Sequence, residues 1–117
     1  MDNKAINLGK GGAARLAVYS EQPQGGMLPN AVYDLGELTA ATTFELAAAT
    51  DDATANIWYW TFETGATAPT ITWPQAATLW ADGEAPMIDA NMHYEISVMN
   101  GVGAVLSAPI PTNENNG

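Results

Sequence analysis

The single histidine is the first residue to consider for chemistry. His93 is the only imidazole of the 117-residue chain, and cysteine is absent. A thiolate metal site is therefore excluded, and a paired-imidazole site cannot form within one copy. A trimer would bring three copies of His93 together if they lay near its axis, where three imidazoles bind a metal. The alternative, which we expect, is an exposed histidine on a strand.

The carboxylates form no recognisable reaction centre. Asp51 and Asp52 supply oxygens of the kind that calcium prefers, but no Asp-x-Asp-x-Asp-Gly pattern surrounds them. Glycosidases need two carboxylates flanking a cleft, and among 13 acidic residues some pair always meets that condition. The Gly9-Lys10-Gly11-Gly12 stretch is too short for a phosphate-binding loop and lacks its helix. The sequence therefore predicts no enzyme, with no catalytic residue, metal or cofactor.

The tryptophans are the stronger candidates for recognition. Aromatic side chains on β-domains stack on sugar rings, and the chain has four tryptophans that could do so: Trp58, Trp60, Trp73 and Trp80. Trp58 and Trp60 alternate with Phe62 along one strand, so packing in a core explains them without a ligand. In the sugar-binding interpretation, Trp80 is the candidate glycan contact.

Charge divides the chain into two unequal parts. Lys4, Lys10 and Arg15 are its only basic residues besides His93, and from Leu16 onward there are carboxylates but no lysine or arginine. Such a surface repels phosphates, so nucleic-acid binding by the folded part is excluded. The first 15 residues form either a basic arm that docks on an acidic partner or a solvated tail.

Membrane insertion and secretion are not predicted. No run approaches the roughly 18 apolar residues that a membrane-spanning helix needs. The N-terminus, MDNKAINLGKGG, lacks the apolar core of a secretion signal, so we expect synthesis and folding in a cytoplasm. Without disulfides, the fold must be held together by packing or by association.

The elements that must position these residues are strands. Alternation of apolar and polar residues predicts Met92–Met99 as a strand, and Asn100-Gly101 is typical of a two-residue hairpin turn. Both faces of Ala55–Glu63 are apolar, which predicts a central strand covered by a second sheet and by a neighbouring subunit. The other expected strands are Ala13–Ser20, Ala31–Leu38 (with a bulge or a bend at Gly36), Thr42–Ala47, Thr70–Trp73, Ala77–Ala81 and Val102–Ala108.

The strands form one domain between two polar ends. Seven to eight short strands at turn-rich intervals predict an antiparallel β-sandwich or jelly-roll-like domain over residues 28–108. Residues 1–27 form an N-terminal arm and linker, rich in glycine and proline towards the end. Residues 109–117 are a polar C-terminal tail.

The order of these elements resembles small β-sandwich domains of head fibres and tail fibres in tailed bacteriophages. The resemblance runs from Leu28 to Leu106, about two thirds of the chain. The landmarks that carry it are Leu28-Pro29-Asn30 before Tyr33, Leu35-Gly36, Thr43-Phe44-Glu45-Leu46, the aromatic strand through Phe62, Thr70-Ile71-Thr72-Trp73-Pro74, Trp80, Ala90-Asn91 before Tyr94, and Ile96-Ser97-Val98.

The resemblance implies a virion protein that acts by binding, commonly as a homotrimer. No coiled coil, triple-β repeat or tip domain extends the chain, which favours a head fibre or capsid decoration protein over a tail spike. By analogy, Lys4, Lys10 and Arg15 would anchor the chain to the major capsid protein or another virion protein. The core or subunit interface would be formed by Trp58, Trp60, Phe62, Trp73, Tyr94 and Ile96.

Two alternatives remain at this point. A tail-fibre-type carbohydrate-binding module would attach the virion to a host or surface glycan. A small hydrolase on the same scaffold is disfavoured by the single histidine and the absence of cysteine.

Overall fold

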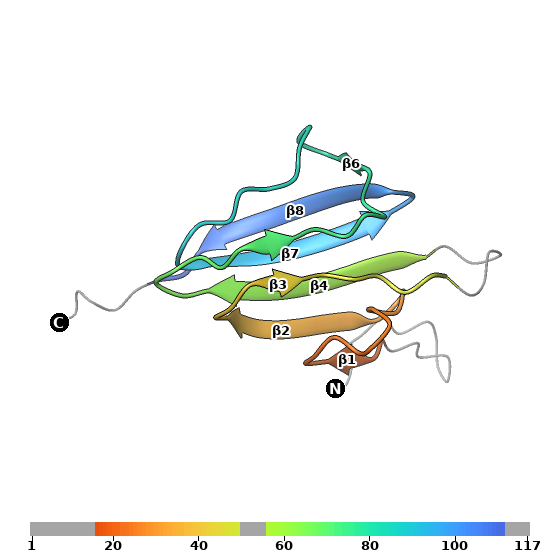
Figure 1. The fold of residues 1–117 in the computed structure, drawn as a ribbon, viewed down its shortest axis with the longest axis horizontal. Coiled ribbons are helices and arrows are strands. Elements are labelled where there is room, and N and C mark those ends of the chain that lie inside the picture. Colours follow the sequence, from red (N-terminus) through yellow and green to blue (C-terminus); the bar gives the residue numbers. More distant parts are fainter. Residues whose placement is uncertain (1–15, 50–55, 112–117) are drawn as a thin grey trace, which may run out of the picture.

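The computed structural model describes residues 16–49 and 56–111 of the chain. These residues form an all-β structure without a helix (Figure 1). Its eight strands are β1 (Val18–Tyr19), β2 (Val32–Leu38), β3 (Thr42–Thr43), β4 (Ile57–Thr64), β5 (Ile71–Thr72), β6 (Leu79–Trp80), β7 (Met92–Met99) and β8 (Val102–Pro109).

Six strands form one sheet in the order β1-β2-β4-β7-β8-β6, and β3 pairs with β5 in a second, two-stranded sheet. Figure 1 shows β3 and β5 in front of the large sheet. We expected antiparallel sheets, but the six-stranded sheet is mixed and the two-stranded sheet is parallel. The β4-β7 and β7-β8 pairs are antiparallel, whereas β1-β2, β2-β4, β3-β5 and β6-β8 are parallel. The parallel β2-β4 pair arises because the chain crosses through β3 before it returns to the sheet.

The β7-β8 hairpin confirms the strand and the turn that the sequence predicted. Strand β7 has the predicted bounds, and its side chains Tyr94, Ile96 and Val98 are buried. Asn100 and Gly101 have φ angles of 54° and 78°, the left-handed values that a two-residue turn of this kind requires. The turn thereby fixes the register of β8 on β7, from Met99 opposite Val102 onward.

The bulge predicted in β2 is also present. The pairing of β2 with β4 shifts between Asp34 and Glu37, and Gly36 between them has a φ of 71°. A residue without a Cβ adopts that conformation at little cost, so glycine suits a bulge at this position.

The core lies between the large sheet and the segments that cross its inner face. Strand β4 sits near the centre of the sheet and contributes Trp60 and Phe62, both with no exposed surface. Phe44, which follows β3, covers them with ring centroids at 5.1 Å from Trp60 and 5.2 Å from Phe62. Tyr94, Ile96 and Val98 of β7 complete this wall, together with Met27, Ala31 and Tyr33.

Strand β3 is shorter than the predicted Thr42–Ala47 because a side chain and a single bridge replace regular pairing there. Only Thr42 and Thr43 of Thr42–Ala47 pair as a strand with β5. The Gln22 side-chain amide hydrogen-bonds the backbone of Thr43 and Glu45, where a neighbouring strand would otherwise pair. Further along, Met27 forms an isolated bridge with Leu46. Alternation therefore predicts the inward side chain, Phe44, better than it predicts the strand bounds.

The structured part also extends to the N-terminal side of Leu28, where we placed the start of the compact domain. Strand β1 pairs with β2 at the edge of the sheet, and Tyr19 stacks on Tyr33 at 5.1 Å. Met27 has no exposed surface. Residues 16–27 thus contribute an edge strand and a core side chain.

Candidate functional site

The residues predicted for the core or subunit interface all lie on the inner side of the sheet. Trp60, Phe62, Tyr94 and Ile96 are buried in the core, and Trp58 and Trp73 pack against it. The predicted capsid-anchoring residues Lys4, Lys10 and Arg15, as well as Asp51 and Asp52, lie outside the described residues. Two other surfaces remain as candidate sites: the opposite face of the sheet and a groove beside Trp73.

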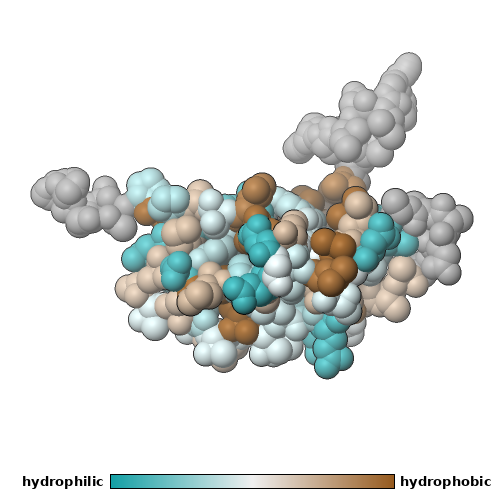
Figure 2. All heavy atoms as spheres, turned by 90° about the horizontal axis from the view of Figure 1, so that it is seen from above, coloured by the Kyte–Doolittle hydropathy of each residue, from teal (hydrophilic) through white to brown (hydrophobic). Residues whose placement is uncertain are grey.

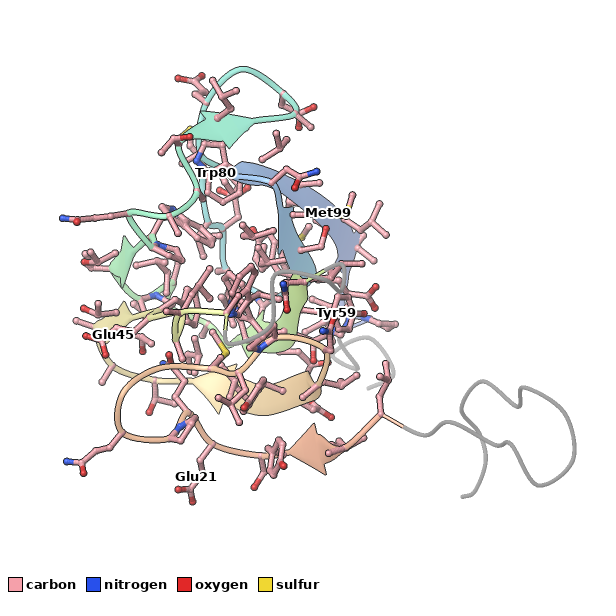
Figure 3. All side chains as sticks on the ribbon, turned by 90° about the vertical axis from the view of Figure 1, so that its right-hand side faces the viewer. Glu21, Glu45, Tyr59, Trp80 and Met99 are labelled. Carbon is pink, nitrogen blue, oxygen red and sulfur yellow. The ribbon has the colours of Figure 1, made fainter. Side chains whose placement is uncertain are left out.

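We call the opposite side of the six-stranded sheet the outer face. It carries the side chains that alternate with the core residues, among them Ile57, Tyr59, Thr61 and Glu63 of β4. Figure 3 views the molecule from the side, with Tyr59 and Met99 on the outer face and Glu45 on the covered side. We expected β4 to be covered on both faces, by a second sheet and by a neighbouring subunit. Within the described residues no strand lies over the outer face, where Ile57 is 40% exposed, so cover of this face by a neighbouring subunit stays a prediction.

One end of the outer face is aliphatic. The register places Ile57 beside Met99, Met99 beside Val102, and Val102 beside Leu79. All four side chains of this apolar row are exposed. Val18 on β1 and Leu106 on β8 are further exposed apolar side chains of the outer face, at 68% and 69%, but Leu106 lies opposite Glu95 and not beside this row. Figure 2 looks down on the side formed by β6 and β8 and shows brown apolar side chains reaching the surface among polar ones.

The other end of the outer face is charged and polar. Here His93 lies between two carboxylates, with Nδ1 3.1 Å from Glu63 and Nε2 3.1 Å from Glu95. The Thr61 hydroxyl donates a hydrogen bond of 3.1 Å to Asp34. His93 therefore lies on a strand, as expected, but it is partly buried and doubly partnered instead of freely exposed.

These carboxylates change the protonation of their neighbours. The hydrogen bond with Glu95 raises the pKa of His93, and Glu63 adds to the rise, while burial opposes it. Burial, followed by the hydrogen bond with Glu95, raises the pKa of Tyr59. Imidazolium is the form that donates from both ring nitrogens, so the geometry favours a charged His93.

This cluster is not arranged as a metal centre. Glu63 and Glu95 bind opposite nitrogens of one ring, so their oxygens and the imidazole do not converge on a common point. Across the described residues, no group of three or more histidine and carboxylate side chains is placed to hold a metal ion.

The second candidate site is an open groove on the covered side of the sheet. Its volume is about 460 Å³, within the range of roughly 300–1,000 Å³ that small-molecule sites occupy. One wall is Thr43–Leu46, and the other is the segment Thr72–Ala76, with Gly25 at one end. The aromatic side chains in its lining are Phe44 and Trp73.

Trp73, rather than Trp80, is the tryptophan that lines this groove. The two indoles pack edge to face, with their ring centroids 5.2 Å apart. Trp80 in turn packs on Gly103, its register partner on β8. Trp80, the predicted glycan contact, therefore supports Trp73 from the side and is absent from the groove lining.

Sequence reasoning missed Gln22 and Glu45, which shape the groove. The Gln22 amide donates to the Thr43 carbonyl and accepts from the Glu45 N–H, both at 3.1 Å. These partners are more than 20 residues apart in sequence, and no local pattern identifies such a contact. The outer face could have been predicted from the sequence, because Met99 alternates outward from the core residues of Met92–Met99.

The described parts of the chain include no helix that could span a bilayer. None of the protein-family models, curated proteins or solved structures compared with the chain matches it. The resemblance to virion fibre domains thus stays a prediction.

Proposed function

We propose that the protein is a bacteriophage virion structural protein, a head fibre or capsid decoration protein that assembles as a homotrimer and acts by binding. The virion setting rests on the order of sequence landmarks between Leu28 and Leu106. The proposed self-assembly rests on one structural observation, the exposed aliphatic end of the outer face.

The apolar row is the part of the outer face that favours a partner. Ile57, Met99 and Val102 lie side by side on three neighbouring strands, and Leu79 continues the row on the fourth. Clustered apolar side chains of this kind mark interaction surfaces more often than isolated ones do. Beside the row, Ser97 and Ala104 form the next pair across β7 and β8. Their small side chains allow a second surface to approach closely.

In a closed ring of three copies, the same face of each copy turns towards the axis. The aliphatic end of the face would then meet its equivalents there and lose its contact with water, at about 25 cal/mol per Å² of apolar area. In this proposal the partner copies provide the second layer over the outer face, and the assembled domain is sandwich-like. The charged end, with Glu63 and Glu95, stays at the periphery, where water screens its repulsion.

The predicted capsid anchor is the basic segment before β1. It holds every lysine and arginine of the chain (Lys4, Lys10 and Arg15), whereas the described domain has none. An acidic surface on the major capsid protein or another virion protein would attract this segment and not the domain.

Deletion of residues 1–15 tests the anchoring role. We expect purified virions of the encoding phage to lose the protein, as measured by mass spectrometry, while the isolated domain keeps its fold and oligomeric mass. Deletion of residues 112–117, which contain no basic residue, is the matched control and should leave incorporation unchanged. Wild-type incorporation without residues 1–15 would refute the anchor.

The alternative function, a carbohydrate-binding module for host or glycan attachment, is supported by a different surface, the groove beside Trp73. Because that groove lies on the covered side of the sheet, it stays available when the outer face is occupied.

A further inference from the structure

We propose that the groove beside Trp73 binds a neutral saccharide, with the Trp73 indole as the stacking surface and Glu45 and Gln75 as hydrogen-bonding groups. This inference is independent of the assembly through the outer face. It rests on the shape of the groove, the rigidity of its walls, and the side chains that line it.

The wall formed by Thr43–Leu46 is held in place along its length. On one side, Gln22 pairs with the Thr43 carbonyl and the Glu45 N–H. Next to it, Met27 donates to the Glu45 carbonyl and accepts from the Ala47 N–H, both at 2.8 Å. On the other side, the Phe44 N–H donates to the Thr72 carbonyl at 3.0 Å. A site with fixed walls loses little conformational entropy when a ligand binds.

The aromatic wall is fixed as well. The ring centroid of Trp73 lies 5.6 Å from that of Phe44 and 5.2 Å from that of Trp80. The following residue, Pro74, is buried. The indole is nevertheless only partly buried and lines the groove. An immobilised, partly exposed indole offers a flat apolar surface, which matches the C–H face of a sugar ring.

Polar side chains surround this surface. Thr43, Glu45, Thr72 and Gln75 line the groove and are exposed. Among the described residues, none of the four side chains has a hydrogen-bond or ion-pair partner. Two hydroxyls, a carboxylate and an amide together provide both donors and acceptors, as the hydroxyl groups of a sugar require. In Figure 3 Glu45 points away from the sheet at the covered side of the molecule.

Charge selects among possible ligands. Glu45 is the only ionisable side chain in the lining, and no lysine or arginine occurs from Leu16 onward. Sialylated, sulfated and phosphorylated glycans would bring anions next to a carboxylate without a cation to offset the repulsion. Hexoses and N-acetylhexosamines without charge avoid this cost, so they are the ligand class that we infer.

A glycan array probed with the fluorescently labelled full-length protein tests the inference. The array should carry neutral glycans of hexoses and N-acetylhexosamines next to sialylated and sulfated glycans. We expect binding to neutral glycans only. Saturation-transfer NMR with the best-bound neutral glycan should then show contact to the sugar ring, and titration should give its Kd.

Variants distinguish this site from other surfaces. Trp73→Ala should abolish binding, but it also removes core contacts, so the exposed residues provide the cleaner test. Glu45→Ala and Gln75→Ala should each weaken binding about fivefold to tenfold, because each removes one or two hydrogen bonds to the sugar. Glu84→Ala is the matched control, since Glu84 is exposed and does not line the groove, and it should bind like the wild type.

Three results would overturn the inference: no binding to neutral glycans, preference for acidic glycans, or wild-type affinity in both Glu45→Ala and Gln75→Ala. The oligomeric mass of the protein has no bearing on these readouts, so a failure here leaves the proposed assembly standing, and the reverse also holds.

Discussion

The six-membered ring of Trp80 lies directly against Gly103, so that a Cβ added at residue 103 would come within 2.6–2.9 Å of three ring carbons. Gly103 is buried on β8, and Trp80 pairs with it from β6. The contact links the edge strand to the groove, because Trp80 in turn supports Trp73.

Gly103→Ala should therefore destabilise the protein. The new methyl group displaces a rigid indole that is packed on both sides, and overpacking of this kind costs about 1–3 kcal/mol. Urea denaturation followed by tryptophan fluorescence measures the loss. Gly65→Ala is the matched control: its Cβ meets only the carboxylate end of Glu37, which is free to move, so the change should be small. Equal effects of the two substitutions would contradict the account of Trp80.

The Gln22 side chain should contribute measurably to stability although it lies in a loop. Gln22→Ala removes two hydrogen bonds to the backbone around β3, each worth about 1 kcal/mol. We expect a loss of about 1–2 kcal/mol in the free energy of unfolding, measured by chemical denaturation. Gln24→Ala, an exposed glutamine two residues on without a hydrogen bond among the described residues, should be nearly neutral. An unchanged stability of Gln22→Ala would show that water replaces the amide at no cost.

The charged end of the outer face should make stability depend on pH. The hydrogen bonds with Glu95 and Glu63 raise the pKa of His93. A group whose pKa is raised on folding adds stability below its unfolded value, about 6.5, and this contribution is lost as the pH rises through the folded pKa. The stability advantage of the wild type over His93→Gln should therefore be largest in mildly acidic solution and disappear in alkaline solution.

NMR titration of the His93 ring tests the cause of this dependence. Because the hydrogen bond with Glu95 is the largest contribution, Glu95→Gln should lower the pKa of His93 from its wild-type value. A wild-type His93 that titrates below about 6.5 would contradict the arrangement.

The sequence predicted the long strands and their inward side chains well. Tyr94, Ile96 and Val98 alternate over eight residues, and the Asn100-Gly101 turn fixes the next strand, so local information suffices there. It did not predict the parallel pairings or the bounds of the short strands, because both depend on contacts between distant segments. The Gln22 amide beside β3 is such a contact, and it also determines one wall of the groove.

For the candidate sites, too, local sequence identified residue types but not the contacts between distant segments. Trp73 and Trp80 were recognised as candidates by residue type, but only the structure distinguishes a supporting indole from one that lines a groove. The outer face was expected to be covered because both sides of β4 are apolar. Ile57 and Met99 are exposed in the single chain, so of the two expected covers of β4 the neighbouring subunit is the one that stays a prediction.

Substitution in the apolar row should separate assembly from folding. Met99 is 44% exposed, so Met99→Glu should change the stability of the isolated domain by about 0.5 kcal/mol or less. In the assembly it would place a carboxylate in an apolar contact and dissociate the copies. Met87→Glu is the matched control, because Met87 is 84% exposed on the segment between β6 and β7, outside the sheet, and should leave assembly intact. Dissociation by both substitutions, or by neither, would remove the apolar row from the interface.

The mass of the protein in solution tests the central claim most directly. Sedimentation equilibrium of the wild-type chain should give three times the chain mass of 12.3 kDa, and the same measurement on Met99→Glu should give the monomer. A wild-type protein that remains a monomer at all accessible concentrations would contradict self-assembly through the outer face.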